Sequence, residues 1–468
     1  MAKNSSLSAR RRAHIFTDPQ KWKPLAREDV RGADYLFEII DPVVALLKLS
    51  AQDKKHLNIK FSGMLFYGES GTGKTYIARY IASASGVRFV IGNSFPREHD
   101  EDEWTKDDMI ALFENLRAYV KQAQQPVILF FDQFDSVIAS ASEEATAQLY
   151  TELDGMSGPL EGILVIGATT IEQGELDPQL VRPGRLGTTV AFFSPNRKGR
   201  AEILRYYLDQ SVHEDIAIED LAPPLTQMTP ATLKHLIDMA RERAQVRAGE
   251  SEEKKITKED VLCAFIRIAI KPQGPNTDGL SVKTKRAFAV HEIGHAVVGY
   301  VLGRMVTLVH VIPTTTTGGE TYIEASDEMM KKDDLRMLIA ESYGGIIAGE
   351  ICGMPSEIGG GEDLESATAE AYDLVQKFGS GLRFHREFGL LTVGEHGKSD
   401  KLAELIEEDV GGILRAEEKT ARDILGEVGK ETIITLADIL VTERILFSNE
   451  FSARMKQFGI EQKTQRPR

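Results

Sequence analysis

The sequence predicts an α/β fold for the first part of the chain, a mostly parallel sheet flanked by helices, with mainly helical domains after it. Over residues 27–192, helical patterns alternate with short apolar runs bounded by turn residues, at 61–68, 88–92, 127–132, 162–169 and 188–193. Uninterrupted apolar runs of this length are typical of strands covered on both faces. From residue 194 to about 270, amphipathic helical patterns replace these runs. The rest of the chain is again helical, apart from one hairpin or edge strand expected within about 306–325.

These patterns divide the chain into six segments. We expect a basic flexible extension, the α/β domain, a helical domain, a linker, a second mainly helical domain and a disordered tail. The linker is placed where two prolines and two glycines occur in nine residues. The six segments are 1–26, 27–192, 193–270, 271–279, 280–462 and 463–468.

Composition and charge exclude several classes of protein. Hydrophobic residues make up 42% and charged residues 27% of the 468 positions, as in water-soluble proteins of two or three domains. The formal charge of −15 disfavours nucleic acid as a partner. No charge-free apolar run approaches the roughly 18 residues of a membrane span, and the N-terminus lacks the apolar core of a secretory signal. Cys263 and Cys352 are too far apart for a CxxC site. We therefore expect a cytoplasmic protein with no membrane span.

A glycine-rich loop predicts a nucleotide site. It follows an apolar run and precedes a helical pattern, the context in which consecutive backbone N–H groups can face phosphates at a helix N-terminus. A lysine would reach the outer phosphates, and a threonine would ligate magnesium. The loop residues are Gly68, Glu69, Ser70, Gly71, Thr72, Gly73, Lys74 and Thr75.

The apolar run 127–131 ends at Asp132, the position of a carboxylate that holds magnesium in nucleoside triphosphatases. The next residue is Gln133, where hydrolysis usually needs a carboxylate to deprotonate the attacking water. An amide can bond that water but cannot accept its proton. We therefore expect ATP binding with slow turnover. Gln133 is either a natural departure or a substitution that traps the nucleotide, and the sequence leaves both origins open.

Two further positions fit phosphoryl transfer. Thr170 ends the next apolar run and is placed to position the water or the γ-phosphate. Arg182 and Arg185 follow on a proline-marked turn, from which an arginine can reach a nucleotide across an interface. An isolated Arg-Pro-Gly-Arg is more often a surface turn, but its order after the phosphate loop and Asp132 favours the functional interpretation.

A metal motif lies in the C-terminal part. His291 and His295 are four residues apart in a helical pattern, so both imidazoles can meet one zinc ion. Glu292 follows the first histidine and can act as general base beside the metal. A catalytic zinc needs a third protein ligand. Asp363, after three glycines, is one candidate, but local chemistry equally explains it as a carboxylate favoured at a helix N-terminus.

The order of these motifs, over about residues 27–460, resembles that of the FtsH-like AAA+ zinc metalloproteases. The resemblance implies a P-loop AAA+ domain, a helical lid and a zinc metallopeptidase domain, with Zn²⁺, ATP and Mg²⁺ as cofactors. It implies that the adenine lies by the segment 29–32, which includes Val30 and Gly32, that Asp363 is the third zinc ligand, and that Glu292 is the catalytic base. Arg185, with Arg182, would reach a neighbour's ATP. A hexameric ring would thread unfolded protein substrates into a proteolytic chamber.

The sequence departs from this family in several places. Family members typically carry N-terminal membrane helices, and we expect none here. The family's further arginine falls near Thr188, and its aromatic threading motif is replaced by an acidic stretch followed by Trp104. We hypothesise that Trp104 grips substrate.

The preferred interpretation is an ATP-dependent zinc endopeptidase whose ATP hydrolysis is slowed by Gln133. One alternative is an ATP-binding ring whose peptidase activity is independent of hydrolysis. Another is a chaperone or scaffold with a structural zinc site, against which Glu292 argues, because a structural site needs no base.

Overall fold

The computed structural model describes residues 23–49, 63–97, 103–156, 160, 162–175, 177–216, 218–225, 228–249, 254–270, 281–313, 318–323, 331–354, 360–380 and 400–462. The chain divides into two compact units, Met1–Ser211 with Gln227–Asp238, and Val212–Thr226 with Met239–Arg468. The predicted linker and C-terminal tail, and most of the predicted N-terminal extension, lie outside the described residues.

The first unit is built on a five-stranded parallel sheet. Each apolar run that predicted a strand forms one, and the strand order is β2-β3-β4-β1-β5. The strands are β1 (Met64–Tyr67), β2 (Arg88–Ile91), β3 (Val127–Phe131), β4 (Ile163–Thr169) and β5 (Thr188–Ala191). The predicted parallel α/β fold is therefore confirmed.

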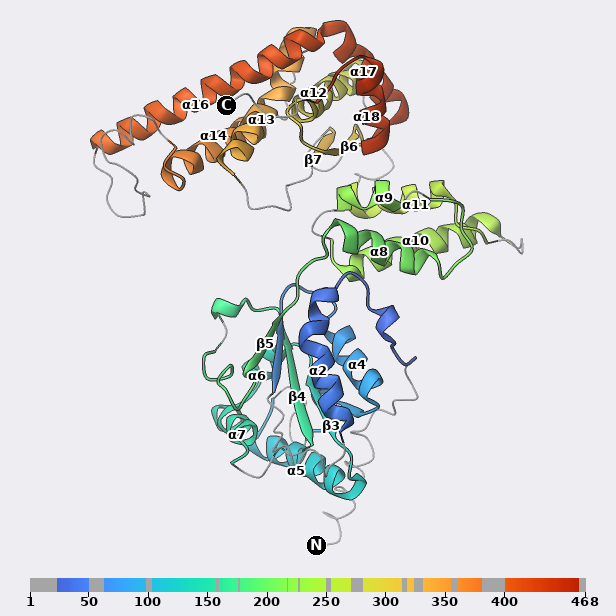
Figure 1. The fold of residues 1–468 in the computed structure, drawn as a ribbon, viewed down its shortest axis with the longest axis vertical. Helices are drawn as coiled ribbons and strands as arrows, with labels where there is room; N and C mark the ends of the chain where they lie inside the picture. The colour runs from blue at the N-terminus through green and yellow to red at the C-terminus, as the bar shows by residue number, and fades with distance from the viewer. Residues whose placement is uncertain are drawn as a thin grey trace. The chain divides into compact units, whose positions relative to one another are not determined.

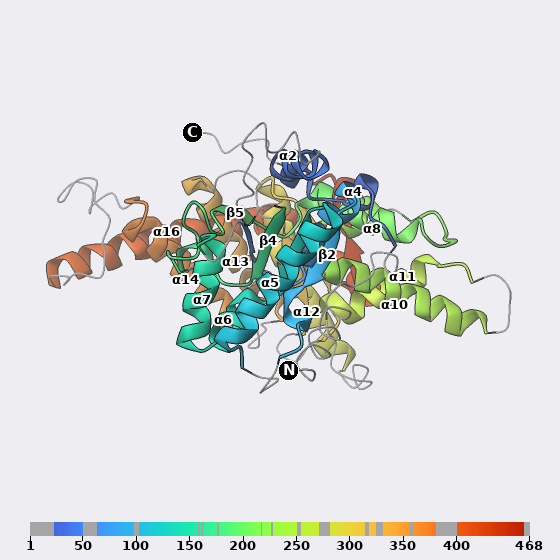
Figure 2. The same ribbon diagram turned by 90° about the horizontal axis from the view of Figure 1, so that it is seen from below.

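Helices cover both faces of this sheet, as Figures 1 and 2 show. Because side chains alternate along a strand, Ile128 and Phe130 pack in one core with α2 and α4, whereas Leu129 and Phe131 pack in another with α5, α6 and α7. The covering helices are α2 (Phe37–Lys48), α4 (Lys74–Ser85), α5 (Lys106–Ala123), α6 (Phe134–Ala139) and α7 (Glu143–Leu153), and α8 (Arg197–Leu208) follows β5 in the chain without packing on the sheet. This two-sided burial explains why the strand sequences are apolar at consecutive positions.

The second unit is mainly helical. Helix α10 (Pro230–Ala248) enters it from the first unit, and α9 (Ile218–Leu221) and α11 (Lys258–Phe265) belong to it. Its larger helices are α12 (Val282–Val301), α13 (Lys332–Cys352), α14 (Gly360–Gln376), α16 (Asp400–Val428), α17 (Lys430–Glu443) and α18 (Ser448–Gln457) (Figure 1). No helix in the described ranges is long and apolar enough to cross a membrane.

The predicted hairpin forms part of a small antiparallel sheet in this unit. Strand β6 (Val306–His310) lies between β7 (Glu320–Ile323) and β8 (Ile445–Phe447). Sequence analysis did not predict β8, whose three residues come from far along the chain. This sheet brings β7 to the side of α12.

Helix α12 is the centre of the second unit, and it crosses α13 at glycines. A Cβ atom on Gly294 would lie 2.2 Å from the carbonyl oxygen of Gly344, and one on Gly344 would lie 2.6 Å from that of Gly294. The two backbones therefore touch, which side chains at these positions would prevent. From Ala289 onward α12 is buried on every side, so its polar residues face protein rather than water.

Candidate nucleotide and metal sites

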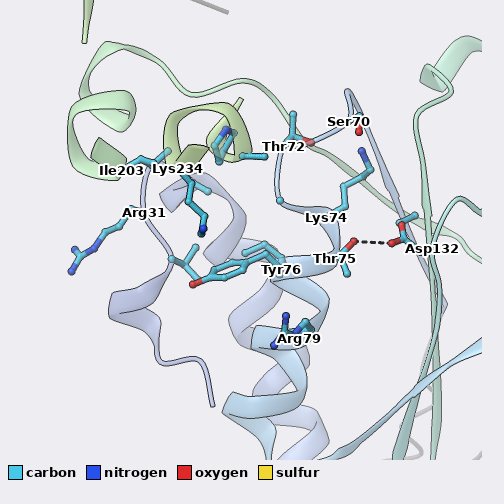
Figure 3. A pocket seen from close by; sticks show the side chains of 18 of the residues that line it. Arg31, Ser70, Thr72, Lys74, Thr75, Tyr76, Arg79, Asp132, Ile203 and Lys234 are labelled. Atoms are coloured by element: carbon cyan, nitrogen blue, oxygen red, sulfur yellow. Dashed lines mark hydrogen bonds between the residues drawn. The ribbon is translucent and has the colours of Figure 1, made fainter. Parts of the chain in front are cut away.

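A cavity of about 450 Å³ lies in the first unit (Figure 3), a volume within the range of small-ligand sites. It is lined by most of the residues predicted to bind nucleotide, namely Val30, Ser70, Gly71, Thr72, Gly73, Lys74, Thr75, Asp132, Gln133 and Thr170. The other three, Gly32, Gly68 and Glu69, are not among its lining residues. Gly68 and Glu69 contribute backbone carbonyls, and Gly32 packs against the backbone of Gly199.

Glycine shapes the loop between β1 and α4. Gly68 has φ 133°, and a Cβ atom there would lie 2.1 Å from the carbonyl oxygen of Phe192. Gly73, directly before α4, has φ 102°, in the left-handed region. These conformations favour glycine, and they turn the chain from strand to helix within the length of the motif.

The charged groups of this loop have internal partners. The Lys74 ammonium donates to the carbonyl oxygens of Gly68 at 2.6 Å and Glu69 at 2.7 Å. Burial lowers the pKa of Lys74, and the charges of Asp132 and Asp135 oppose that shift. The Thr75 hydroxyl donates to Asp132 Oδ2 at 3.2 Å (Figure 3), so the two expected magnesium ligands lie together.

Asn93 holds the end of β3 and was missed by sequence analysis. Its amide accepts from the N–H of Asp132 at 2.9 Å and donates to the carbonyl oxygen of Asp132 at 2.8 Å. Gln133 follows with φ 47° and an exposed side chain at the start of α6. Thr169 donates to Asp135 at 2.7 Å, next to Thr170 in the cavity wall.

Two tyrosines at the other end of the cavity were also missed, and both bond to Asp29. The Tyr206 hydroxyl on α8 donates to Asp29 Oδ1 at 2.5 Å, and the Tyr76 hydroxyl on α4 donates to the Asp29 carbonyl at 3.1 Å. Burial raises the pKa of Tyr76 to about 12, so its hydroxyl keeps its proton. Asp29 thus ties α8 to the helix that follows the phosphate loop. Tyrosines in helical patterns are ordinary, so the sequence carried no distinct signal for Tyr76 or Tyr206.

The two predicted arginines differ in their surroundings. Arg185 makes two 2.7 Å bonds to the carboxylate of Asp154 and donates to the carbonyl of Gln179 at 2.9 Å. Its guanidinium lies 4.6 Å from the ring centroid of Tyr150. Arg182, on the same turn, is exposed. The side chain of Arg185 is therefore held within its own chain.

The hypothesis that Trp104 grips substrate does not fit its position. Trp104 is only 2% exposed and stacks on Phe95, with ring centroids 6.3 Å apart. Its ring also meets the edge of Phe131 in strand β3 at 6.2 Å. The indole belongs to the core beneath the sheet, where it cannot contact a threaded chain.

In the second unit, three predicted metal ligands from two helices converge. His291 Nε2 and His295 Nε2 on α12 are 3.1 Å apart. Asp363 Oδ2, near the start of α14, lies 3.0 Å from the first and 3.3 Å from the second. Although burial alone would raise it, the two histidines hold the pKa of Asp363 well below its usual range.

The geometry of these atoms fits zinc. Zn–N and Zn–O bonds of about 2.0–2.1 Å in a tetrahedral site place neighbouring ligand atoms roughly 3.3–3.4 Å apart. The three distances of 3.0–3.3 Å are close to that spacing. Two imidazoles and a carboxylate are also a donor set that zinc prefers, so these residues could hold the ion.

Helix α13 shapes the metal site from behind. The carbonyl of Glu341 lies 2.7 Å from His295 Nδ1, so it accepts that N–H and leaves Nε2 free to bind metal. A Cβ atom on Gly345 would lie 2.4 Å from His295 Nε2 and 2.6 Å from His291 Nδ1. Glycine at 345 therefore provides the space in which the histidines meet.

Glu292 lies beside this cluster and is almost fully buried. Burial raises its pKa, whereas the two histidines and a hydrogen bond from Thr321 oppose the rise. The Thr321 hydroxyl on β7 is 2.8 Å from Glu292 Oε2. Sequence analysis missed Thr321, because nothing in the local pattern links β7 to α12.

A phosphate-loop ATPase domain and a His-His-Asp zinc site with an adjacent glutamate, in one chain, define an ATP-dependent metalloendopeptidase. Residues 64–193 match the ATPase family associated with various cellular activities (AAA), and residues 279–453 match Peptidase family M41.

The chain is also similar along most of its length to known proteases. It is 30% identical to ATP-dependent zinc metalloprotease FtsH 1 of Thermoanaerobacter, over 93% of this chain and 70% of that protein. It is 28% identical to FtsH 3 of Symbiobacterium thermophilum, over 95% and 73%. Against human YME1L1 it is 29% identical over 96% of this chain but 59% of the relative, less than two thirds of its length.

The chain therefore belongs to the FtsH-like family of AAA+ zinc metalloproteases. Its cofactors are Zn²⁺ and ATP with Mg²⁺.

Proposed function

We propose that this chain unfolds and degrades protein substrates in a ring-shaped hexamer, and that Gln133 slows its ATP hydrolysis. The observation that carries the peptidase part is the convergence of His291, His295 and Asp363 beside the buried carboxylate of Glu292. The relatives' names describe zinc proteases that depend on ATP, which supports the coupling.

For peptide hydrolysis, His291, His295 and Asp363 would hold the zinc ion. Bound zinc supplies Lewis-acid polarisation of the scissile carbonyl and acidifies a water molecule. Glu292 accepts the proton of the attacking water and passes it to the nitrogen of the leaving amine. Burial favours this exchange, because it raises the pKa of Glu292 above that of an exposed glutamate.

For ATP hydrolysis, Lys74 would leave its two loop carbonyls and bind phosphate oxygens. Thr75 and Asp132 would hold Mg²⁺ directly or through water. Gln133 lines the same cavity next to Asp132, where its amide can orient a water molecule but cannot take its proton. Slow turnover with normal binding follows from that chemistry.

We assign the trans-acting role on the arginine turn first to Arg182. Arg185 is engaged by Asp154, Gln179 and Tyr150 of its own chain, so it would position the turn unless those contacts break. Arg182 is exposed at the surface of the first unit, as a residue that reaches a neighbouring subunit must be.

The test compares degradation of an unfolded protein by this chain, which serves as the reference, termed wild type, in all experiments, and by Gln133→Glu, with and without ATP and a zinc chelator. We expect the chelator to stop cleavage by both chains, and Gln133→Glu to hydrolyse ATP faster and degrade faster. Cleavage that survives chelation would overturn the metalloprotease assignment. Unchanged ATP turnover in Gln133→Glu would remove the missing base as the cause of slow hydrolysis.

A second function is favoured by Gln133 itself, namely a ring in which ATP serves only assembly. In that case wild-type cleavage would require bound ATP but would proceed equally with a non-hydrolysable analogue. Sedimentation of the chain with each nucleotide measures both the ring size and its dependence on ATP.

A further inference from the structure

We propose that Thr321 is a positioning residue for peptide hydrolysis, which fixes the carboxylate of Glu292 for proton transfer. The hydroxyl of Thr321 lies 2.8 Å from Glu292 Oε2 and 3.0 Å from the backbone carbonyl oxygen of Glu292. A hydroxyl has one proton to donate. The carboxylate is the stronger acceptor, since it is charged and since the carbonyl of a residue inside α12 already accepts a helical hydrogen bond.

The register of the small sheet aims Thr321 at α12. Strand β7 pairs with β6 so that Thr321 lies opposite Val309 and Glu320 lies opposite His310. Neighbouring side chains on a strand point to opposite faces. Glu320 and Tyr322 accordingly bond each other at 2.9 Å, on the face where Tyr322 meets the ring of His310, and Thr321 takes the face toward Glu292.

Gly319 allows the strand to come this close. A Cβ atom on Gly319 would lie 2.9 Å from Glu292 Cγ and 2.5 Å from the carbonyl oxygen of His310. Any larger residue would push β7 away from the glutamate. The side chain of Glu292 is thus confined along its stem by Gly319 and held at its end by Thr321.

This contact divides the work between the two carboxylate oxygens. With Oε2 bonded to Thr321, Oε1 remains to accept the proton of the attacking water. The water O–H bond breaks as an Oε1–H bond forms and the water oxygen bonds to the scissile carbonyl carbon. The proton then moves from Oε1 to the nitrogen of the leaving amine as the C–N bond breaks. The terminal torsion of a glutamate is otherwise broad, so without Thr321 the carboxylate would spend less time in the reactive orientation.

The same contact also gives the hydroxyl of Thr321 its hydrogen-bond partner. The experiment must therefore distinguish a role in stabilising the fold from a role in positioning Glu292. The chain offers a matched control in Thr307 of strand β6. Thr307 is buried, and its hydroxyl lies in the same sheet but donates to a different acceptor, the carbonyl of Tyr322, at 3.0 Å. Valine at either position removes one hydroxyl and keeps the shape.

The experiment measures kcat and KM of the full zinc-loaded chain on a fluorogenic peptide, together with zinc content. Because the inference rests on the peptidase function, wild type and Glu292→Gln are measured first, and cleavage that Glu292→Gln loses establishes the reaction. We expect Thr321→Val to lower kcat about tenfold with KM and zinc content unchanged, as for a misplaced catalytic group. Thr321→Ser should stay within about twofold of wild type, and Thr307→Val should keep its kcat.

A second readout does not depend on activity. Crystals of zinc-loaded wild type should show one conformer of the Glu292 carboxylate, and crystals of Thr321→Val more than one. The proposal is overturned if Thr321→Val keeps the wild-type kcat, if Thr307→Val lowers kcat equally, or if serine fails to rescue. Loss of zinc from Thr321→Val would also overturn it, because the role of Thr321 would then be to build the metal site. Thr321→Ala serves in the same scheme if the valine variant does not fold.

Discussion

The zinc site and the nucleotide cavity differ in how their charged groups are held before any ligand arrives. At the zinc site, ligand atoms of His291, His295 and Asp363 already face one another at 3.0–3.3 Å. In the nucleotide cavity, Lys74 is bonded to carbonyls of its own loop, and on the nearby turn Arg185 is bonded to Asp154. The metal site is built for permanent occupation, whereas nucleotide binding must exchange internal bonds for bonds to phosphate. Such an exchange suits a ligand that comes and goes.

The difference follows from the elements that carry each site. The metal ligands lie on helices whose backbones are packed in a core, and Gly345 leaves no free volume around them. The phosphate loop contains three glycines with positive φ, namely Gly68, Gly71 and Gly73. Glycine can adopt many backbone conformations, so the loop can rearrange and turn its N–H groups toward a phosphate. Rigidity and exchange are therefore both encoded locally.

The largest effect is expected at the zinc site. Glu292→Gln replaces a proton acceptor by an amide that cannot accept one, and we expect kcat for peptide cleavage to fall about 10²- to 10⁴-fold. ATP turnover and zinc content should not change. Glu320→Gln, on the other face of β7, is the matched control and should retain activity. A Glu292→Gln chain that still cleaves peptides would remove Glu292 from the reaction.

Adding one carbon atom tests how rigid the metal site is. In Gly345→Ala the new methyl group would overlap His295 and His291, so we expect zinc affinity to fall about 10- to 100-fold. Competition with a chromogenic chelator measures this. Gly412→Ala on α16, where a Cβ atom would meet nothing within 4 Å, should bind zinc as wild type does. Equal affinities in the two variants would mean that the site adapts.

His310 provides a pH test of the same unit. Burial lowers its pKa to about 4, below the usual value of about 6.5 in an unfolded chain. The unfolded state therefore binds the proton first as pH falls below 6.5, and the stabilisation by neutral His310 is lost progressively until pH 4. Between pH 7.5 and 5 we expect a loss of about 2 kcal/mol.

Hydrogen exchange of the β6 amides in wild type and His310→Gln measures that loss. All other residues are the same in both chains, so the difference between the two pH profiles isolates His310. Parallel profiles would contradict the lowered pKa.

The smallest effect is expected at the nucleotide cavity, where internal bonds are exchanged for bonds to the ligand. Tyr206→Phe removes the hydrogen bond from α8 to Asp29, whose segment lines the nucleotide cavity. A lost bond of this kind costs about 0.5–1.5 kcal/mol, so fluorescent ADP should dissociate about two- to tenfold faster. Stopped-flow displacement measures the rate. Tyr119→Phe on α5, outside the cavity, should release ADP at the wild-type rate, and an unchanged rate in Tyr206→Phe would show that Asp29 does not hold nucleotide.

Sequence patterns were sufficient where a site is built within one segment. The phosphate loop is contiguous, and His291 and His295 are one helical turn apart, so spacing alone predicted their meeting. The apolar runs predicted all five strands of the parallel sheet, because burial on both faces leaves a strong local signal.

The residues that were missed act between distant segments. Thr321 reaches Glu292 across 29 positions, and Asn93 reaches Asp132 across 39. Neither contact leaves a local pattern. The hypothesis that Trp104 grips substrate does not fit the structure for another reason. A large aromatic side chain gains most from burial, and its place after an acidic stretch gave no information about which way it points.

The contact of α12 with α13 at Gly294 and Gly344 has a consequence for the evolution of the protease unit. Where two helices meet through side chains, a larger residue on one can be offset by a smaller residue on the other, and their spacing drifts over time. Here backbone touches backbone, so neither helix has a side chain that a smaller residue could replace. The separation of the two helices is fixed by the peptide unit itself, and core substitutions elsewhere can change how stable the unit is while the distance from α13 to the histidines of α12 stays constant.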